Sequence, residues 1–137
     1  MKKTQMLALL VSLLLPSLAF AQSSHATSAQ AEKSWQPFYA AFRAAANKRD
    51  RAALKRMMSS RFETNGGGGF TADKWIRQMD RDNLWPQIQK SVALGAKPYH
   101  FANQRRPQRI TNDEQQGSLI FEFGKDGRWR WTAVMGD

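Results

Sequence analysis

The chain has 137 residues, a formal net charge of +10 and no cysteine. A chain of this length forms one domain with a modest core and is too short for two. The lack of cysteine excludes disulfide bonds and thiolate metal sites, so the fold must be held together by packing. Five tryptophans and eight phenylalanines supply large apolar rings for that purpose.

The first residues predict a secretory signal peptide. Lys2 and Lys3 precede an apolar run over residues 6–15, and residues 19–21 read Ala-Phe-Ala, the small-residue pattern of a cleavage site. We therefore expect residues 1–21 to be cleaved off and the protein to reach the periplasm or to be secreted. An uncleaved membrane anchor is the alternative, although the apolar run is short for a membrane span.

Removal of such a signal peptide lowers the formal net charge to +8, because it carries two lysines. A basic surface of this strength attracts anionic partners such as lipid head groups and acidic envelope polymers. Nucleic acid is not expected as a partner in the periplasm. The alternative is that the charge serves only to keep the protein soluble.

Residues 22–33 have no apolar period, and we expect a flexible leader there before a single domain over residues 34–137. From Ser34 onward, apolar side chains recur at helical spacing. Ser34 is expected to cap this helix, with Pro37 in its first turn. The stripe consists of Trp35, Phe38, Tyr39, Phe42 and Ala46.

A second helix is expected after Asp50, which is a good N-cap. Its inner face would carry Ala53, Leu54, Met57 and Met58. The surrounding residues form the densest positive patch of the chain, which is a candidate surface for an anionic partner, with an ordinary solvated helix face as the alternative. We name as this candidate surface Lys48, Arg49, Arg51, Lys55 and Arg56.

Four glycines, residues 66–69, follow a short predicted strand over residues 61–64. They lack the Gly-Lys-Ser/Thr ending of a phosphate-binding P-loop and the spacing of a dinucleotide fingerprint. A flexible joint between strand and helix is the preferred interpretation. A gate over a pocket, or a weak anion contact at the helix start near Thr71, is the alternative.

The next predicted helix begins with Thr71 as its cap and Asp73 in its first turn, and places Trp75, Ile76 and Met79 on its apolar side. Helix then resumes after Asp82 or Asn83. It runs through Leu84, Trp85, Ile88, Val92 and Leu94, with Pro86 in its first turn or at a kink, and stops at Gly95.

The period then changes to the alternation of strands. Short strands are expected over residues 99–101 and 108–111, and a hairpin over residues 118–137. A three-residue turn ending in a left-handed Gly127 makes paired positions sum to 252. That register pairs Phe123 with Trp129, Phe121 with Trp131, Leu119 with Ala133 and Glu122 with Arg130, and it leaves Ile120 and Val134 on the outer face for a second copy.

Few residues carry recognisable chemistry. The chain has two histidines, His25 in the expected leader and His100 in a strand, and no carboxylate cluster with calcium-loop spacing, so we expect no metal and no cofactor. No Gly-x-Ser-x-Gly nucleophile motif occurs. His100 is a candidate general base if it faces a pocket, and a structural role on the strand is the alternative.

The order of an aromatic helix with Trp-x-x-Phe-Tyr-x-x-Phe, two further helical segments and a terminal sheet with Asp-Gly-Arg-Trp resembles the nuclear transport factor two-like superfamily. That superfamily includes ketosteroid isomerase-like and polyketide cyclase-like proteins. The resemblance implies an α+β fold in which N-terminal helices pack on a curved antiparallel sheet to form a cone, often a homodimer through the outer sheet face. It places Tyr39 where isomerase-like members have a hydrogen-bonding tyrosine. The implied apolar pocket would be lined by Tyr39, Phe42, Trp85, Phe121, Trp129 and Trp131.

Because aromatic residues are abundant and no acid/base pair is recognisable, the sequence favours a noncatalytic periplasmic module that binds a small apolar or aromatic ligand, or another partner. The alternative is a small-molecule isomerase, lyase or hydrolase in which Tyr39 and His100 act in the pocket. Association with an anionic envelope component through the candidate basic surface is a third possibility.

Overall fold

The computed structural model describes residues 17–65, 69–100, 106–111 and 117–136, with side chains from residue 27 onward. Within these residues the chain forms an α+β fold of four helices and one five-stranded mixed sheet. None of these helices is long and apolar enough to cross a membrane. In chain order the elements are α1 (Ser17–Lys48), α2 (Arg51–Arg56), β1 (Met58–Thr64), α3 (Ala72–Arg81), α4 (Trp85–Ala93), β2 (Ala96–Tyr99), β3 (Gln108–Thr111), β4 (Ser118–Phe123) and β5 (Trp129–Met135).

The strands lie in the order β1-β5-β4-β3-β2. Strands β2 to β5 form an antiparallel meander, whereas β1 pairs with β5 in parallel. The predicted antiparallel sheet is therefore wrong for its first strand. The sequence pattern indicated that this strand exists, but its partner is the last strand of the chain, and local periodicity carries no information on so distant a pairing.

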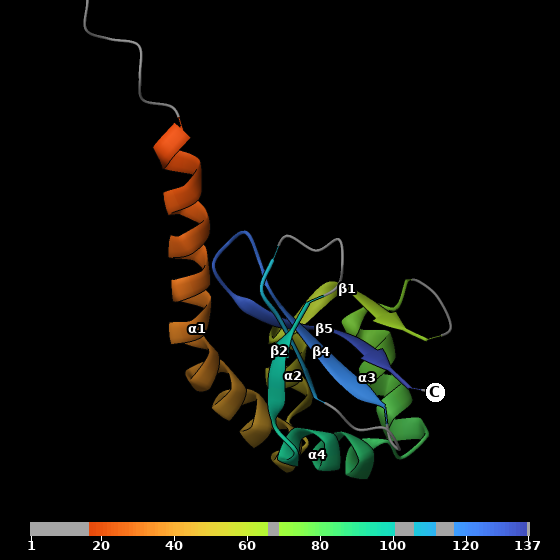
Figure 1. Cartoon of the computed structure of the whole chain (residues 1–137). Helices are drawn as coiled ribbons and strands as arrows, with labels where there is room; N and C mark the ends of the chain where they lie inside the picture. The colour runs from red at the N-terminus through yellow and green to blue at the C-terminus, as the bar shows by residue number, and fades with distance from the viewer. Residues whose placement is uncertain (1–16, 66–68, 101–105, 112–116, 137) are drawn as a thin grey trace, which may run out of the picture.

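Figure 1 shows α1 running along one side of the sheet and extending beyond it at its N-terminal end. The helices pack on the sheet face that carries the large aromatic side chains. From α1, Trp35 contacts Trp129 at 4.8 Å between ring centroids, and Phe42 contacts Trp131 at 5.3 Å. Trp75 of α3 meets Trp131 at 6.5 Å. Helices and sheet thus share one aromatic core.

Helix α1 begins before Ser34, so the predicted cap at Ser34 is wrong, and residues 22–33 lie within the helix rather than in an irregular leader. The Ser34 hydroxyl instead donates back to the Gln30 and Ala31 carbonyl oxygens. Ala31 is 2% exposed, and its carbonyl oxygen accepts the Trp129 indole N–H at 2.9 Å. This contact across the fold favours helix in a segment whose apolar period is weak. Pro37 therefore lies inside α1, where it removes a backbone donor.

Most predicted helix ends are confirmed. The Asp50 carboxylate accepts the Ala53 N–H, the Thr71 hydroxyl accepts the Lys74 N–H, and Gly95 follows α4 with a φ of +83°. Two details differ, because α4 starts at Trp85 rather than at Asp82 or Asn83, and Met58 belongs to β1. The predicted joint or gate over residues 66–69 falls mostly on residues 66–68, which lie outside the described part of the chain.

The hairpin turn is confirmed: Gly127 has a φ of +75°, and Phe123 pairs with Trp129 and Phe121 with Trp131. Beyond Trp131 the register shifts by one residue, so Ile120 pairs with Ala133 and Leu119 with Val134. The extra residue is Thr132, whose hydroxyl donates to the Ile120 carbonyl oxygen. A bulge of this kind exchanges the faces of the residues that follow it. The predicted Leu119–Ala133 pair is therefore wrong.

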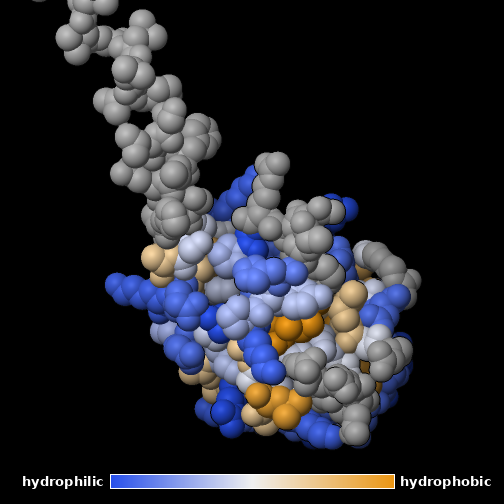
Figure 2. All heavy atoms as spheres, viewed as in Figure 1, coloured by the Kyte–Doolittle hydropathy of each residue, from blue (hydrophilic) through white to orange (hydrophobic). Residues whose placement is uncertain are grey.

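The bulge also changes the outer face of the sheet. Val134 packs against the core cluster, while Ile120 and Ala133, each 5% exposed, are buried outside that cluster. Ile120 and Val134 therefore do not form the exposed apolar pair predicted for contact with a second copy. In Figure 2, hydrophilic residues dominate the visible face and hydrophobic atoms gather only in small areas. Among the described residues, the exposed large hydrophobic side chains are Leu94 and Met135.

Candidate functional site

The six aromatic side chains predicted to line a pocket lie in or against the packed core. Phe42, Phe121 and Trp131 have no exposed area, and their rings meet one another at centroid distances of 5.0 Å for Phe42–Phe121 and 5.3 Å for Phe42–Trp131. Trp85 is 2% exposed, and its indole donates to the Asp80 carboxylate at 2.8 Å. Trp129 is the member of this set that lines the clefts described below.

Tyr39 is held in a structural contact. Its hydroxyl donates to the Val92 carbonyl oxygen of α4 at 2.7 Å. Burial raises the pKa of Tyr39 to about 12, against a smaller lowering by Arg43. The hydroxyl therefore remains protonated at neutral pH and fastens α1 to α4. His100 lies apart from it, just beyond the end of β2, at an exposed position. The strand predicted over residues 99–101 is therefore wrong at His100, because the observed strand β2 begins earlier and ends at Tyr99. Phe101, the last residue of the predicted strand, lies outside the described residues.

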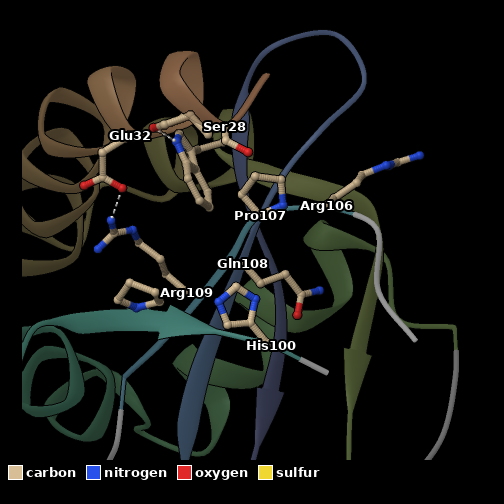
Figure 3. A pocket seen from close by; sticks show the side chains of 10 residues that line it. Ser28, Glu32, His100, Arg106, Pro107, Gln108 and Arg109 are labelled. Atoms are coloured by element: carbon tan, nitrogen blue, oxygen red, sulfur yellow. Dashed lines mark hydrogen bonds and ion pairs between the residues drawn. The ribbon is translucent and has the colours of Figure 1, made fainter. Parts of the chain in front are cut away.

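A cleft of about 300 Å³ opens between α1 and the strands β2 and β3, and we call it the β3 cleft. Figure 3 shows its side chains arriving from the helix on one side and from the strand ends on the other. Its lining residues are Ser28, Ala31, Glu32, Pro98, His100, Arg106, Pro107, Gln108, Arg109 and Trp129.

One wall of the β3 cleft is a buried arginine. Arg109 is 8% exposed; its guanidinium lies 4.8 Å from the Trp35 ring centroid and donates to Glu32 at 2.6 Å. A longer bond of 3.5 Å reaches the Ala96 carbonyl oxygen. Stacking on an aromatic face is a favourable position for a guanidinium. Figure 3 shows Arg109 reaching from β3 to Glu32 on α1. The arginine thus joins helix and sheet beside the opening.

The neighbouring residue, Gln108, has an unsatisfied buried oxygen. Gln108 is only 4% exposed, and its side-chain amide nitrogen donates to the Glu122 carboxylate at 2.9 Å. Because a carboxylate can only accept, this bond fixes which end of the amide is nitrogen. Among the residues that the structure describes, the remaining atom, Oε1, has no hydrogen-bond partner. Buried polar atoms are nearly always paired, so this oxygen, which is shielded from solvent in a residue that lines the cleft, is a candidate acceptor for an external donor if the Gln108 side chain turns toward the opening.

An arginine and a histidine lie at the rim of the β3 cleft. Arg106 is exposed and donates to Glu122 at 3.2 Å, and His100 stands beside Gln108 in Figure 3. The predicted ion pair between Glu122 and Arg130 is wrong, although their cross-strand register is confirmed. Arg130 instead forms a bidentate pair with Asp126 in the turn, at 2.9 and 2.6 Å. Asp126 presents both oxygens to the guanidinium, which a parallel fork of two bonds requires.

The predicted basic surface is divided by ion pairs. Arg51 forms two hydrogen bonds of 2.7 Å with Asp80, and Lys55 pairs with Asp73 at 2.6 Å. The bond from Arg51, then that from Trp85, lowers the pKa of Asp80 to about 2. Lys48 and Arg49 are exposed at the end of α1, and Arg56 lines a second cleft of about 310 Å³. Two of the five predicted cations, Arg51 and Lys55, therefore have carboxylate partners.

Within the residues that the structure describes, no group of three or more histidine, cysteine, aspartate or glutamate side chains is arranged to hold a metal ion. Comparisons of the chain with models of protein families, with curated proteins and with solved structures find no match. The resemblance drawn from the sequence therefore stays a prediction.

Sequence reasoning missed the residues that give the β3 cleft its chemistry, namely Glu32, Arg106, Gln108 and Arg109. Gln108 and Arg109 were placed correctly in a strand, but consecutive polar residues in a short strand give no sign that both are buried. Glu32 fell in the segment expected to be irregular. No local sequence signal therefore marks these residues.

Proposed function

We propose that this protein binds a small polar ligand in the β3 cleft. The observation that carries the proposal is the Gln108 oxygen, which is buried at the cleft without a hydrogen-bond partner. Leaving such an atom unpaired costs about 1–3 kcal/mol. A ligand N–H or O–H that bonded to it would recover that cost, so the site gains more from a ligand than a fully paired surface would.

The remaining walls indicate the chemistry of the ligand. Arg106 at the rim favours an anionic group, and Pro98, Pro107 and Trp129 offer apolar surface. The Glu32 side chain is 71% exposed although it pairs with the buried Arg109. An anionic group on the ligand can therefore replace Glu32 on Arg109 without crossing the core. We infer a ligand with a hydrogen-bond donor at one end and a carboxylate or phosphate at the other.

Native mass spectrometry of the full chain, purified gently from its native cells, tests this proposal. We expect an additional mass on the wild-type protein that is lost from the Gln108→Met variant. Gln87→Met, which changes an exposed glutamine on α4, is the matched control and should keep the mass. A bare wild-type chain, or a mass that Gln108→Met retains, would contradict the proposal.

The protein is further proposed to be exported and to be a nuclear transport factor two-like cone. The lysines and apolar run before the Ala-Phe-Ala sequence support export, and helices packed on one face of the sheet are consistent with a cone. N-terminal sequencing of protein recovered from the periplasm should begin at Gln22. That cleavage would leave Ala31 and Glu32, the helix residues that contact Trp129 and Arg109, in the mature chain.

A further inference from the structure

A second region of the surface has the features of a binding site that the β3 cleft does not use. Two clefts, of about 310 and 490 Å³, share Arg130 as a lining residue, so they adjoin, and we call them together the basic groove. The first is lined by Ser34, Phe38, Arg56, Met57, Gly127, Arg128, Trp129 and Arg130. The second is lined by Lys55, Met58, Ser59, Ser60, Ala72 and Arg130.

The charges of the basic groove are unbalanced. Arg130 pairs with Asp126 at 2.6 Å and Lys55 pairs with Asp73 at 2.6 Å. In the described part of the chain, Arg56 and Arg128 form no ion pair, and both are exposed. The two come from different elements, since Arg56 ends α2 and Arg128 immediately precedes β5. Two guanidinium groups that form no ion pair within the described residues therefore line one cleft from two different elements.

The shape of the donor set indicates which anion fits. A carboxylate has two oxygens in one plane, and a single guanidinium fork uses both of them. A phosphate presents oxygens in three directions, so it can accept from two guanidinium groups and a hydroxyl at once. The first cleft offers the guanidinium groups of Arg56 and Arg128, and the second offers the Ser59 and Ser60 hydroxyls near Lys55.

We propose that the basic groove binds a ligand that carries at least two phosphate groups. One phosphate lies between Arg56 and Arg128, and a second lies beyond Arg130, next to the two serines. Phe38 and Met57 are half-buried in the first cleft and provide apolar contact for the part of the ligand that joins the phosphates. Such a ligand is either a soluble oligophosphate or the head group of a lipid with two phosphates.

Isothermal titration calorimetry of the full chain with tripolyphosphate tests the inference. The double variant Arg56→Gln/Arg128→Gln should bind at least about tenfold more weakly, because each guanidinium supplies a charge-assisted bond. Arg77→Gln/Lys90→Gln removes the same charge from exposed positions on α3 and α4 and is the matched control, which should bind within about twofold of wild type. An equal loss of affinity for tripolyphosphate in both double variants would mean that binding reflects general charge attraction, and it would overturn the proposal.

Two further probes identify the source of the phosphates. Cardiolipin vesicles have two phosphates per lipid head group, and binding that depends on Arg56 and Arg128 would assign the groove to a lipid. If tripolyphosphate binds with the same dependence on Arg56 and Arg128 and the vesicles do not bind, the groove is assigned to a soluble ligand. If polyglutamate binds as tightly as tripolyphosphate and with the same dependence, the groove selects charge rather than phosphate, and the proposal fails. Circular dichroism spectra matching wild type verify that each variant is folded.

Discussion

The two halves of the sheet bury different kinds of side chain. On β4 and β5, Phe121 and Trp131 have no exposed area and contact rings from α1 and β1. On β3, the buried residues are Gln108, Arg109 and Thr111, all polar. The aromatic half gains stability mainly from apolar burial, with the Trp129 and Trp131 indole N–H groups bonded to backbone carbonyl oxygens. The polar half retains an unpaired oxygen and an ion pair with an exposed partner, which is a poor arrangement for stability and a suitable one for binding.

Of the substitutions considered, Trp131→Ala should lower the stability most, since it leaves a cavity at the centre of the aromatic half. We expect the free energy of unfolding to fall by about 3–5 kcal/mol, measured by urea denaturation. Much of the stability of a domain this size would be lost, so Trp131→Phe should be made in parallel and should lose less. A loss below about 1 kcal/mol for Trp131→Ala would show that stability does not depend on this cluster.

In the polar half, Arg109→Ala should cost about 2 kcal/mol, because it removes the stack on Trp35 and the bond to Glu32. Glu32→Gln should cost less than about 1 kcal/mol, since Glu32 is mostly exposed. Denaturation curves at low and high salt separate the contribution of the ion pair from that of the stacking contact. If both substitutions cost the same, the ion pair and not the stacking holds the arginine.

Tyr39→Phe should cost about 1 kcal/mol at neutral pH through loss of the bond to the Val92 carbonyl. Burial raises the pKa of Tyr39 to about 12, above its ordinary value of about 10 in the unfolded chain. The folded state therefore holds the proton more tightly. The stabilisation of the folded state by the protonated Tyr39 hydroxyl is complete below about pH 10 and disappears as the pH rises through about 12. Unfolding measured from pH 8 to 12 should show wild type losing its advantage over Tyr39→Phe, and a constant difference would contradict this assignment.

The smallest expected effect on stability is that of Gln108→Met, within about 1 kcal/mol of zero in either direction. The variant loses the bond to Glu122 and also loses the unpaired oxygen, while Glu122 keeps Arg106 as a partner. Thermal denaturation of the ligand-depleted protein measures the change. A loss above about 2 kcal/mol would mean that Gln108 supports the fold, and the contrast between the two halves would fail.

The fold was predictable where the cause is local. Asp50, Thr71 and Gly127 act within a few residues, so caps and turn could be derived from the sequence. The Thr132 bulge could not, because it depends on the Trp131 indole and the Thr132 hydroxyl bonding to backbone carbonyls in the folded hairpin. The pairing of β1 with β5 could not be derived either, because the two strands lie far apart in the sequence. The proposed binding residues were missed because the contacts that surround Arg109 come from Trp35 and Glu32 of α1, which lies far away in the sequence.

Trp129 is a lining residue of both the β3 cleft and the basic groove, so the two proposed sites meet at this tryptophan. The bond from its indole N–H to the Ala31 carbonyl oxygen fixes its ring to α1. Two anionic ligands bound together would therefore lie with about one side chain between them and would repel each other. The proposed sites are consequently expected to show negative cooperativity, which should be strongest at low ionic strength and should fade as salt screens the charges.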